Sequence, residues 1–381
     1  MQNSTIPQGA KQYQAMKNRL FLFNLVLNFA FLLVLLFTGW SRSLKIWLLN
    51  FRADFFSINA LYFLVFSALG FILSFPLEFY EGFVLEHTFG LSRQNFKNWF
   101  KDLLKKSGIV LFVSLVMVEV VYFFLSRFPQ TWWLWAAAFW FFISVVLTRI
   151  YPKVILPLFF HSKPLETGEL RSRIVSLLEK YKIRLKDVYS IDFSKKTVKA
   201  NAMVTGLGAT KQIFLSDTLV DGFPYDEIEV VLAHELGHYI SRDTIKLALA
   251  SLCSALFSFF FAGILLDRLL FKFGFGALSD IAGLPLLLSI LILMSLILLP
   301  LQNSYARFLE EKADDFALKA TGNPKSFISM IARLGEKNFS EFSPSRLVEF
   351  FLYDHPPISK RIAKAQMYLV TTEKVVTTGG F

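Results

Sequence analysis

The chain has 381 residues, of which 54% are hydrophobic, and its 40 Lys and Arg residues against 29 Asp and Glu residues give a formal net charge of +11. A mean hydropathy of +0.49 is well above that of a water-soluble domain, so the composition excludes an ordinary soluble protein. We attribute the positive charge to membrane topology and predict no nucleic-acid partner, because no soluble module carries a basic face. The single cysteine, Cys253, excludes an intramolecular disulfide.

Apolar stretches long enough to cross about 30 Å of hydrocarbon occur six times. The first is too long for a signal peptide, and no small-residue cleavage site follows it. The sequence therefore predicts a mainly α, polytopic helical membrane protein in contact with membrane lipid. The predicted spans are Leu20–Trp40, Ile58–Phe79, Gly108–Phe128, Trp132–Ile150, Leu247–Leu266 and Ala282–Leu301.

Basic residues predict the orientation of these spans. Lys11, Lys17 and Arg19 precede the first span, and five basic residues lie between Arg93 and Lys106, whereas the connections after the third and fifth spans carry few charges. Positive-inside reasoning places both termini and the main polar segment in the cytoplasm. The connection Arg42–Arg52, with three basic residues, opposes its assigned side. We expect a multi-pass protein of the bacterial inner membrane, or of the endoplasmic reticulum membrane if the source is eukaryotic.

The spans divide the chain into four parts. Residues 1–150 hold the first four spans and a basic cytoplasmic loop, and residues 151–246 form a cytoplasmic cap. Residues 247–301 hold the last two spans, and residues 302–381 form a C-terminal cytoplasmic part.

The cap is predicted to be a small α+β unit, because helical and alternating apolar spacings both occur in it. Gly206 and Gly208 predict a hairpin turn between its last two strands. A small sheet can hold a peptide as an added strand, or it can merely cover the neighbouring helix, and both readings stay open. The predicted elements are the helix Leu165–Tyr181, the strands Val188–Phe193, Ala200–Val204 and Gln212–Leu215, and the helix Asp226–Ile240.

The last of these helices carries the most informative motif, His-Glu-Leu-Gly-His at residues 234–238. His234 and His238 are four residues apart and therefore share one helical face, where both imidazoles can bind one zinc ion. Glu235 lies beside the metal, in the place of a general base for an activated water. The alternative is a helix that merely exposes polar residues.

A third ligand is expected after the sixth span, because a catalytic zinc takes three protein ligands and leaves the fourth position to water. Glu310 and Asp314 share a helical face. Glu310 can bind the metal while Asp314 accepts a hydrogen bond from a ligand histidine. Glu311 points about 100° away around the helix and is the weaker candidate. Taken alone, an acidic run after a membrane span is usually a solvated face.

These residues resemble the type I CAAX prenyl proteases, integral-membrane zinc endopeptidases of the gluzincin type. The resemblance rests on the histidine motif and on the pattern Asn303-x-x-x-Arg307-x-x-Glu310-x-x-Ala-Asp314. It implies seven spans around a large chamber, whereas six are counted here. It also implies that Asn303, Arg307 and Asp314 surround the metal ligands and hold them in position without binding the metal themselves.

Further site residues follow from the same resemblance. His355, within Tyr-Asp-His-Pro-Pro, and Arg361 are expected to face the active site and bind the developing oxyanion or the substrate carbonyl. The alternative is a loop histidine and a helix-start arginine. The segment Asn201, Ala202 and Met203 is expected to bind substrate.

Together these features predict a zinc endopeptidase with one Zn²⁺ per chain and a protein or peptide substrate. By resemblance, the substrate is the C-terminal tail of a prenylated protein, cut to release a tripeptide. The first alternative is a quality-control peptidase that trims damaged membrane proteins without prenyl specificity. The second is a metal transporter or sensor, which is disfavoured because Glu235 would have no task in it.

Overall fold

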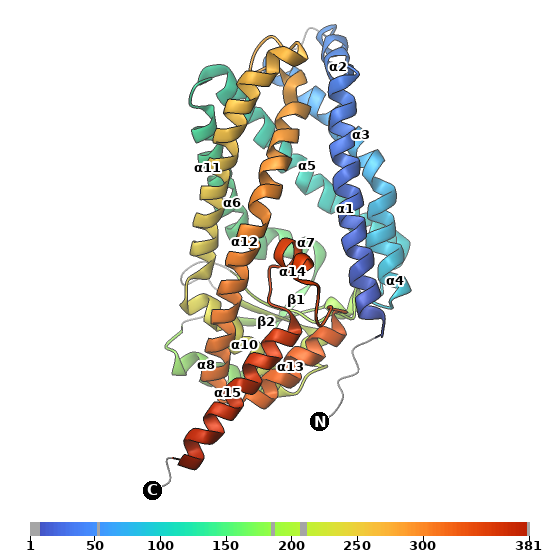
Figure 1. Ribbon diagram of the computed structural model, residues 1–381. Coiled ribbons are helices and arrows are strands. Elements are labelled where there is room, and N and C mark those ends of the chain that lie inside the picture. The colour runs from blue at the N-terminus through green and yellow to red at the C-terminus, as the bar shows by residue number, and fades with distance from the viewer. Residues whose placement is uncertain (1–7, 52–53, 184–186, 206–211, 379–381) are drawn as a thin grey trace.

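The computed structural model describes residues 8–51, 54–183, 187–205 and 212–378. Long helices run side by side to form a bundle, and a smaller unit of helices and strands closes one end of it (Figure 1). Six helices of the described chain are long and apolar enough to cross a membrane. They are α1 (Gln8–Phe37), α3 (Phe55–Phe79), α5 (Phe96–Arg127), α6 (Trp132–Ile150), α11 (Asp243–Leu269) and α12 (Leu284–Thr321).

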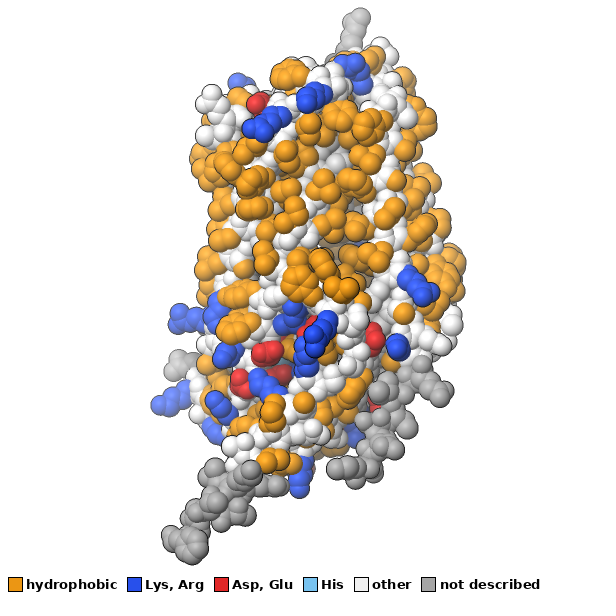
Figure 2. Space-filling model, in the orientation of Figure 1, with side chains coloured by type: hydrophobic (Ala, Val, Ile, Leu, Met, Phe, Trp, Pro, Cys, Tyr) orange, Lys and Arg blue, Asp and Glu red, His pale blue; other side chains and the backbone are white. Residues whose placement is uncertain are grey.

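The six predicted spans are confirmed, and the differences lie at their ends. The first predicted span reaches Trp40, but Gly39 adopts a left-handed backbone with φ of 74° and a short second helix, α2 (Trp40–Leu49), begins there. The sixth span and the predicted third-ligand helix are one unbroken helix, α12, so the boundary expected between residues 301 and 302 falls inside it. On the face shown in Figure 2, hydrophobic side chains cover the middle of the bundle and most of the charged ones lie toward its two ends.

Two basic residues whose charge opposed the predicted orientation, Arg42 and Lys45, have partners at the end of the bundle away from the cap. Arg42 of α2 donates a hydrogen bond to the carbonyl of Gly274. Lys45 forms an ion pair with Asp280 at 2.8 Å. Both partners lie in the connection between α11 and α12, near the short helices η5 (Leu270–Phe273) and η6 (Ile281–Gly283). These positive charges therefore join two connections at one end of the bundle.

At the other end, two membrane helices change pitch before they reach the cap. The helix α3 continues into the π-helical turn η1 (Tyr80–Leu85) and α4 (Glu86–Thr88). In the same way, α6 continues into η2 (Tyr151–Ile155) and α7 (Leu156–Phe159). Pro76 lies one turn before the first π-turn and Pro152 lies within the second. Proline removes a helical hydrogen bond, which favours such a change of pitch.

The cap contains a four-stranded sheet in the order β1-β2-β4-β3. The strands β2 (Asp187–Ile191) and β4 (Gln212–Ser216) are parallel, and β3 (Ala202–Thr205) lies antiparallel to β4 at the edge. These are the three predicted strands. The predicted turn at Gly206 and Gly208 lies outside the described residues. The first strand, β1 (Ser162–Pro164), was not predicted, because its three exposed residues show no apolar alternation.

All but one of the remaining helices of the cap pack on one hydrophobic core, the exception being the helix Arg346–Leu352, which has no buried residue. Leu177 of α8, Leu215 of β4 and Leu232 of α10 are buried in it together with Phe327 of α13. The predicted helix from Leu165 begins four residues later, since the amide of Leu165 donates to Val188 and extends the sheet. The helices are α8 (Glu169–Lys180), α9 (Asp217–Val220), α10 (Tyr225–Ile240), α13 (Pro324–Lys337), α14 (Arg346–Leu352) and α15 (Ile358–Thr378); a short turn, η3 (Phe193–Lys195), precedes β3.

Between the helices of the bundle lies a mainly apolar, partly open cavity of about 970 Å³, here called the bundle cavity. Its walls come from α3, α5, α6, α11 and α12. At the cap end, Val204 and Thr205 of the edge strand β3 also line it. The bundle cavity therefore connects the membrane-spanning part to the sheet of the cap.

Candidate metal and catalytic site

The helices α10 and α12 cross closely at the point where the predicted ligands lie. A Cβ added to Gly237 would lie 3.0 Å from Cα and 3.2 Å from the carbonyl oxygen of Ala313. Only glycine therefore fits at this point of α10 without a shift of the backbone. The two small residues bring the histidine face of one helix against the carboxylate face of the other.

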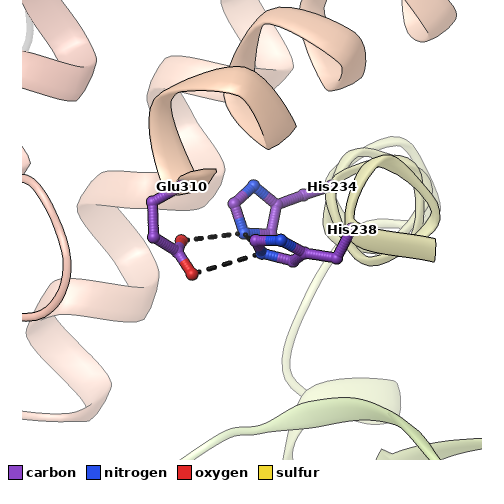
Figure 3. A group of neighbouring side chains, drawn as sticks. All are labelled: His234, His238 and Glu310. Carbon is purple, nitrogen blue, oxygen red and sulfur yellow. Dashed lines mark hydrogen bonds and ion pairs between the residues drawn. The ribbon is translucent and has the colours of Figure 1, made fainter. Parts of the chain in front are cut away.

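His234 and His238 of α10 and Glu310 of α12 converge on one point (Figure 3). Their candidate ligand atoms all lie within 4.8 Å of one another. Nε2 of His234 lies 3.2 Å from Glu310 Oε2, and Nε2 of His238 lies 3.2 Å from Glu310 Oε1. Glu310 Oε2 is buried and has no hydrogen-bond partner among the described residues. A cation between these atoms would satisfy this oxygen, and two imidazoles with one carboxylate form a ligand set that suits zinc.

A buried carboxylate lies behind each of the two histidines. Asp314 Oδ1 lies 2.9 Å from Nδ1 of His234, and Asp243 Oδ2 lies 3.0 Å from Nδ1 of His238. Both aspartates are almost fully buried. Carboxylates in this position fix the tautomer and the orientation of a ligand ring. Lys246 compensates the charge of Asp243 at 2.8 Å.

Asp243 was missed by sequence analysis, which followed residues along a single helix. It is five residues from His238 and lies beyond the end of α10. Arg242 adopts a left-handed backbone with φ of 57°, so the chain turns and α11 begins at Asp243. The turn brings the first residue of a membrane helix back onto the ligand ring. The one available signal was an acidic residue at the start of a helix, which has many other causes.

The ionisable groups of the site influence one another strongly. Burial lowers the pKa of His234, but the carboxylates of Asp314 and Glu310 outweigh burial and raise this pKa to about 9 in the absence of a cation. Burial raises the pKa of Glu235, against the opposing effect of the two histidines. A carboxylate with a raised pKa is a better proton acceptor, which suits a general base.

Glu235, His355 and Arg361 line one cavity of about 380 Å³, here called the cap cavity. Nε2 of His355 lies 3.3 Å from Glu310 Oε1, and its Nδ1 lies 2.7 Å from Asp354. The structure thus brings His355 to the ligand cluster from a separate loop. Arg361 is also close, but its Nε and Nη2 both donate to Asp314.

Asn303 and Arg307 contact backbone rather than ligands. Asn303 donates to the carbonyl of Phe351 at 2.7 Å, and Arg307 donates to the carbonyls of Glu349 and Tyr353. These contacts fasten α14 and the following loop to α12. We predicted that both side chains support the metal ligands directly. Among the described residues they instead hold the segment that leads to His355.

The predicted substrate segment lies at the same cavity, with one correction. Asn201 and Ala202 line the cap cavity. The side chain of Met203 instead packs with Leu156 and Phe214 on the other face of the sheet, because successive residues of a strand point to opposite faces. The side chain of Met203 therefore does not line the cap cavity.

Comparisons with known proteins agree with this geometry. Residues 4–161 match a family model described as CAAX prenyl protease N-terminal, five membrane helices, and residues 164–368 match the model of peptidase family M48. The chain is 30% identical over 361 residues to a protein named uncharacterized metalloprotease YhfN of Bacillus subtilis, which covers 94% of this chain and 84% of the relative. It is 30% identical over 295 residues to the probable CAAX prenyl protease 1 of Schizosaccharomyces pombe, covering 76% of this chain and 62% of the relative.

A solved structure shows the same fold. The crystal structure of S. mikatae Ste24p superposes with a TM-score of 0.83 at 23% sequence identity, covering 96% of this chain and 92% of the other. The two family models together cover residues 4–161 and 164–368, and the Bacillus subtilis relative matches over most of both chains. The chain therefore belongs to peptidase family M48 and is an integral-membrane metalloprotease.

Proposed function

We propose that the protein is a zinc-dependent endopeptidase that cuts the C-terminal tail of prenylated, membrane-anchored proteins. The observation that carries this proposal is the convergence of His234, His238 and Glu310 beside Glu235, in a cavity that reaches the edge strand β3. We expect one zinc ion per chain.

His234, His238 and Glu310 would hold Zn²⁺, which when bound polarises the scissile carbonyl and lowers the pKa of water. Glu235 accepts the proton of the attacking water and delivers it to the leaving amine. His355 stands at the mouth of the site, where its imidazole can donate a hydrogen bond to the developing oxyanion. Arg361 holds Asp314, which orients the ring of His234.

The edge strand β3 is the proposed substrate platform. It pairs with β4 along one side, and no other strand of the described residues pairs with its second side, to which a peptide strand could add. Its two ends lie in different surroundings: Asn201 and Ala202 border the cap cavity, and Val204 and Thr205 border the bundle cavity. A peptide along β3 would therefore extend from the catalytic site toward the membrane.

The two cavities favour one direction of the peptide. The cap cavity is lined by polar and charged side chains, among them Asn201, His355 and Arg361, whereas the bundle cavity is mainly apolar. A lipid on the residue before the cut therefore belongs at the Thr205 end of β3. This direction is antiparallel to β3, and it places the released C-terminal residues in the cap cavity.

The cap is proposed to face the cytoplasm of a bacterial cell. The N-terminal basic residues and those of residues 93–106, most of which belong to the first turns of α5, lie at the cap end, because Arg93 donates to Ser194 of the cap and Gln14 donates to Phe339. Positive-inside reasoning then assigns that end to the cytoplasm. Lipid-anchored proteins of the same compartment could supply substrates from the inner leaflet.

A pair of peptides tests the proposed function. Purified protein in nanodiscs, loaded with zinc, is given a farnesylated C-terminal peptide and its unprenylated twin. We expect the farnesylated peptide to be cut with a kcat/KM at least about tenfold higher, equivalent to about 1.4 kcal/mol. Equal cleavage of both peptides would favour the quality-control peptidase, and cleavage of neither would remove the proposed function.

A further inference from the structure

A groove separates α3 and α5 on the side of the bundle, and we call it the seam groove. Its volume is about 570 Å³, within the range of pockets that bind small ligands. The lining residues recur every three or four positions, so they come from one face of each helix. From α3 they are Phe63, Leu64, Ser67, Ala68, Phe71, Ser74, Phe75 and Glu78, and from α5 they include Leu104, Ser107, Gly108, Leu111 and Ser114.

The seam groove adjoins the bundle cavity. Phe63 and Ser67 of α3 and Val110 and Ser114 of α5 line both spaces. The wall between the two spaces is therefore one layer of side chains, and two of its four members are serines. A rotation of small or flexible side chains can open such a wall more easily than the separation of tightly packed helices.

The seam groove is also open to the outside of the bundle. Leu104 is 49% and Val110 is 56% exposed. A Cβ added to Gly108 would meet no atom within 4 Å, so the space beside this residue is free. In a membrane, this side of the bundle faces lipid, and an apolar chain in the bilayer can reach the groove directly.

Charges mark the end of the seam groove nearest the cap. Lys106 of α5 forms an ion pair with Glu78 of α3 at 2.9 Å, and both side chains are partly exposed. Such a pair is stable at the level of the lipid headgroups and costly within hydrocarbon. The groove therefore runs from the interface into the apolar part of the membrane, which is the path of a chain anchored to a cytoplasmic peptide.

We infer that the seam groove binds the apolar chain of the lipid-anchored substrate and admits it from the bilayer to the bundle cavity. The inference rests on the proposed function, since it assigns a path to the lipid of that substrate. The groove shares its wall with the bundle cavity, which ends at Val204 and Thr205 of β3, so an opening of that wall would join the two spaces. A chain in this path remains in apolar surroundings while its peptide pairs with β3.

We expect the groove to direct the lipid chain toward the bundle cavity without binding it tightly. Transfer of an alkyl chain from lipid tails to an apolar groove gains little hydrophobic free energy, because both surroundings are equally apolar. Blocking the groove should therefore raise KM for lipidated substrates. The KM for a soluble peptide without lipid should not change, because such a peptide enters through the cap.

The first test is a binding experiment that does not require turnover. The Glu235→Gln protein, in nanodiscs with zinc, is mixed with a lipopeptide that carries a diazirine at the end of its isoprenoid chain. After illumination, we expect cross-links in residues 64–75 and 104–114, and we expect an excess of unlabelled lipopeptide to remove them. Labels spread evenly over α1, α3, α5 and α11 and insensitive to the competitor would show bilayer contact only and would overturn the inference.

The second test fills the groove. Gly108→Trp and, from the opposite wall, Ala68→Trp should each raise KM for the farnesylated peptide about tenfold or more and leave cleavage of the unlipidated peptide unchanged. The matched controls are Phe112→Trp on α5 and Ile72→Trp on α3, which are each 68% exposed and line neither cavity. Groove variants that behave like these controls contradict the inference.

The two failures can be told apart. If the unaltered protein cuts neither peptide, the proposed function fails, whereas the cross-linking result with Glu235→Gln still decides whether the groove binds the chain. A loss of cleavage of both peptides in one groove variant indicates a disturbed fold, and the variant of the opposite wall then decides.

Discussion

Arg361 binds both carboxylate oxygens of Asp314, at 2.8 and 2.6 Å; the side chain of Asp314 is buried and that of Arg361 is 12% exposed. Asp314 in turn faces His234, so a guanidinium on α15 reaches a metal ligand on α10 through a carboxylate on α12. The bidentate geometry fixes the plane of the carboxylate as well as its charge. Arg361 thereby acts on the histidine ring, in addition to lining the cap cavity.

We predict that Arg361→Lys lowers zinc affinity by roughly 10–100-fold, because lysine keeps the charge and loses the bidentate contact. Arg361→Ala should also destabilise the protein by about 3–5 kcal/mol, since it leaves a buried carboxylate without its partner. Zinc competition with a chelating dye and thermal unfolding measure the two effects. Unchanged zinc affinity together with a raised KM would instead assign Arg361 to the substrate.

The second prediction concerns Asp243, the carboxylate behind His238. Asp243→Asn retains the shape of the side chain and removes its charge, so zinc affinity should fall by roughly 10–100-fold. The control is Asp315→Asn on α12, a partly exposed residue that pairs with Lys364 rather than with a histidine, and this variant should bind zinc normally. A zinc affinity equal to that of the control would show that Asp243 only caps α11.

The third prediction concerns the choice between neighbouring glutamates. Glu310→Ala, like His234→Ala and His238→Ala, should reduce the zinc content from about one ion per chain to a small fraction, because each removes one of three protein ligands. Glu311→Ala should retain the metal, since this residue lies exposed outside the cluster. Metal analysis of the four purified variants is the measurement, and loss of zinc from Glu311→Ala alone would overturn the ligand assignment.

The pKa of His234 gives the fourth prediction. The pKa in the folded protein is raised to about 9, above an unfolded value of about 6.5. The stability from this shift is therefore fully present below about pH 6.5 and is lost as the pH rises through 9. Zinc must displace the same proton, so zinc affinity should rise over this range.

These two opposite slopes can be measured on one preparation. Thermal unfolding in a chelator should give a midpoint that falls from pH 6.5 to pH 9, and zinc titrations should give an affinity that rises with pH. An affinity independent of pH would contradict a protonated His234 in the cation-free protein.

The sequence was sufficient to predict those parts of the site in which the residues of a pair lie on one helix. The spacing of His234 and His238, and that of Glu310 and Asp314, places each pair on one helical face, and the structure brings these faces together. Apolar length was similarly sufficient for the six membrane helices, because lipid imposes both the composition and the length.

The rest depends on contacts between segments that are distant in the chain. Asp243 reaches His238 through a left-handed turn at Arg242, and the spacing of apolar residues does not predict such a turn. Asn303 and Arg307 were visible as a motif, but their partners are backbone carbonyls, which have no sequence signature. The groove between α3 and α5 could not be predicted either, because it depends on how two distant helices pack and its lining residues are ordinary for a membrane.

The most direct test of the account is the Glu235→Gln variant, measured for zinc content and cleavage together. The amide keeps the size of the side chain but cannot accept the proton of water. We predict about one zinc per chain and a fall in kcat of about 10²–10⁴-fold on the farnesylated peptide. A variant that holds zinc and cuts this peptide at a near-normal rate would contradict the assignment of Glu235 and, with it, the mechanism.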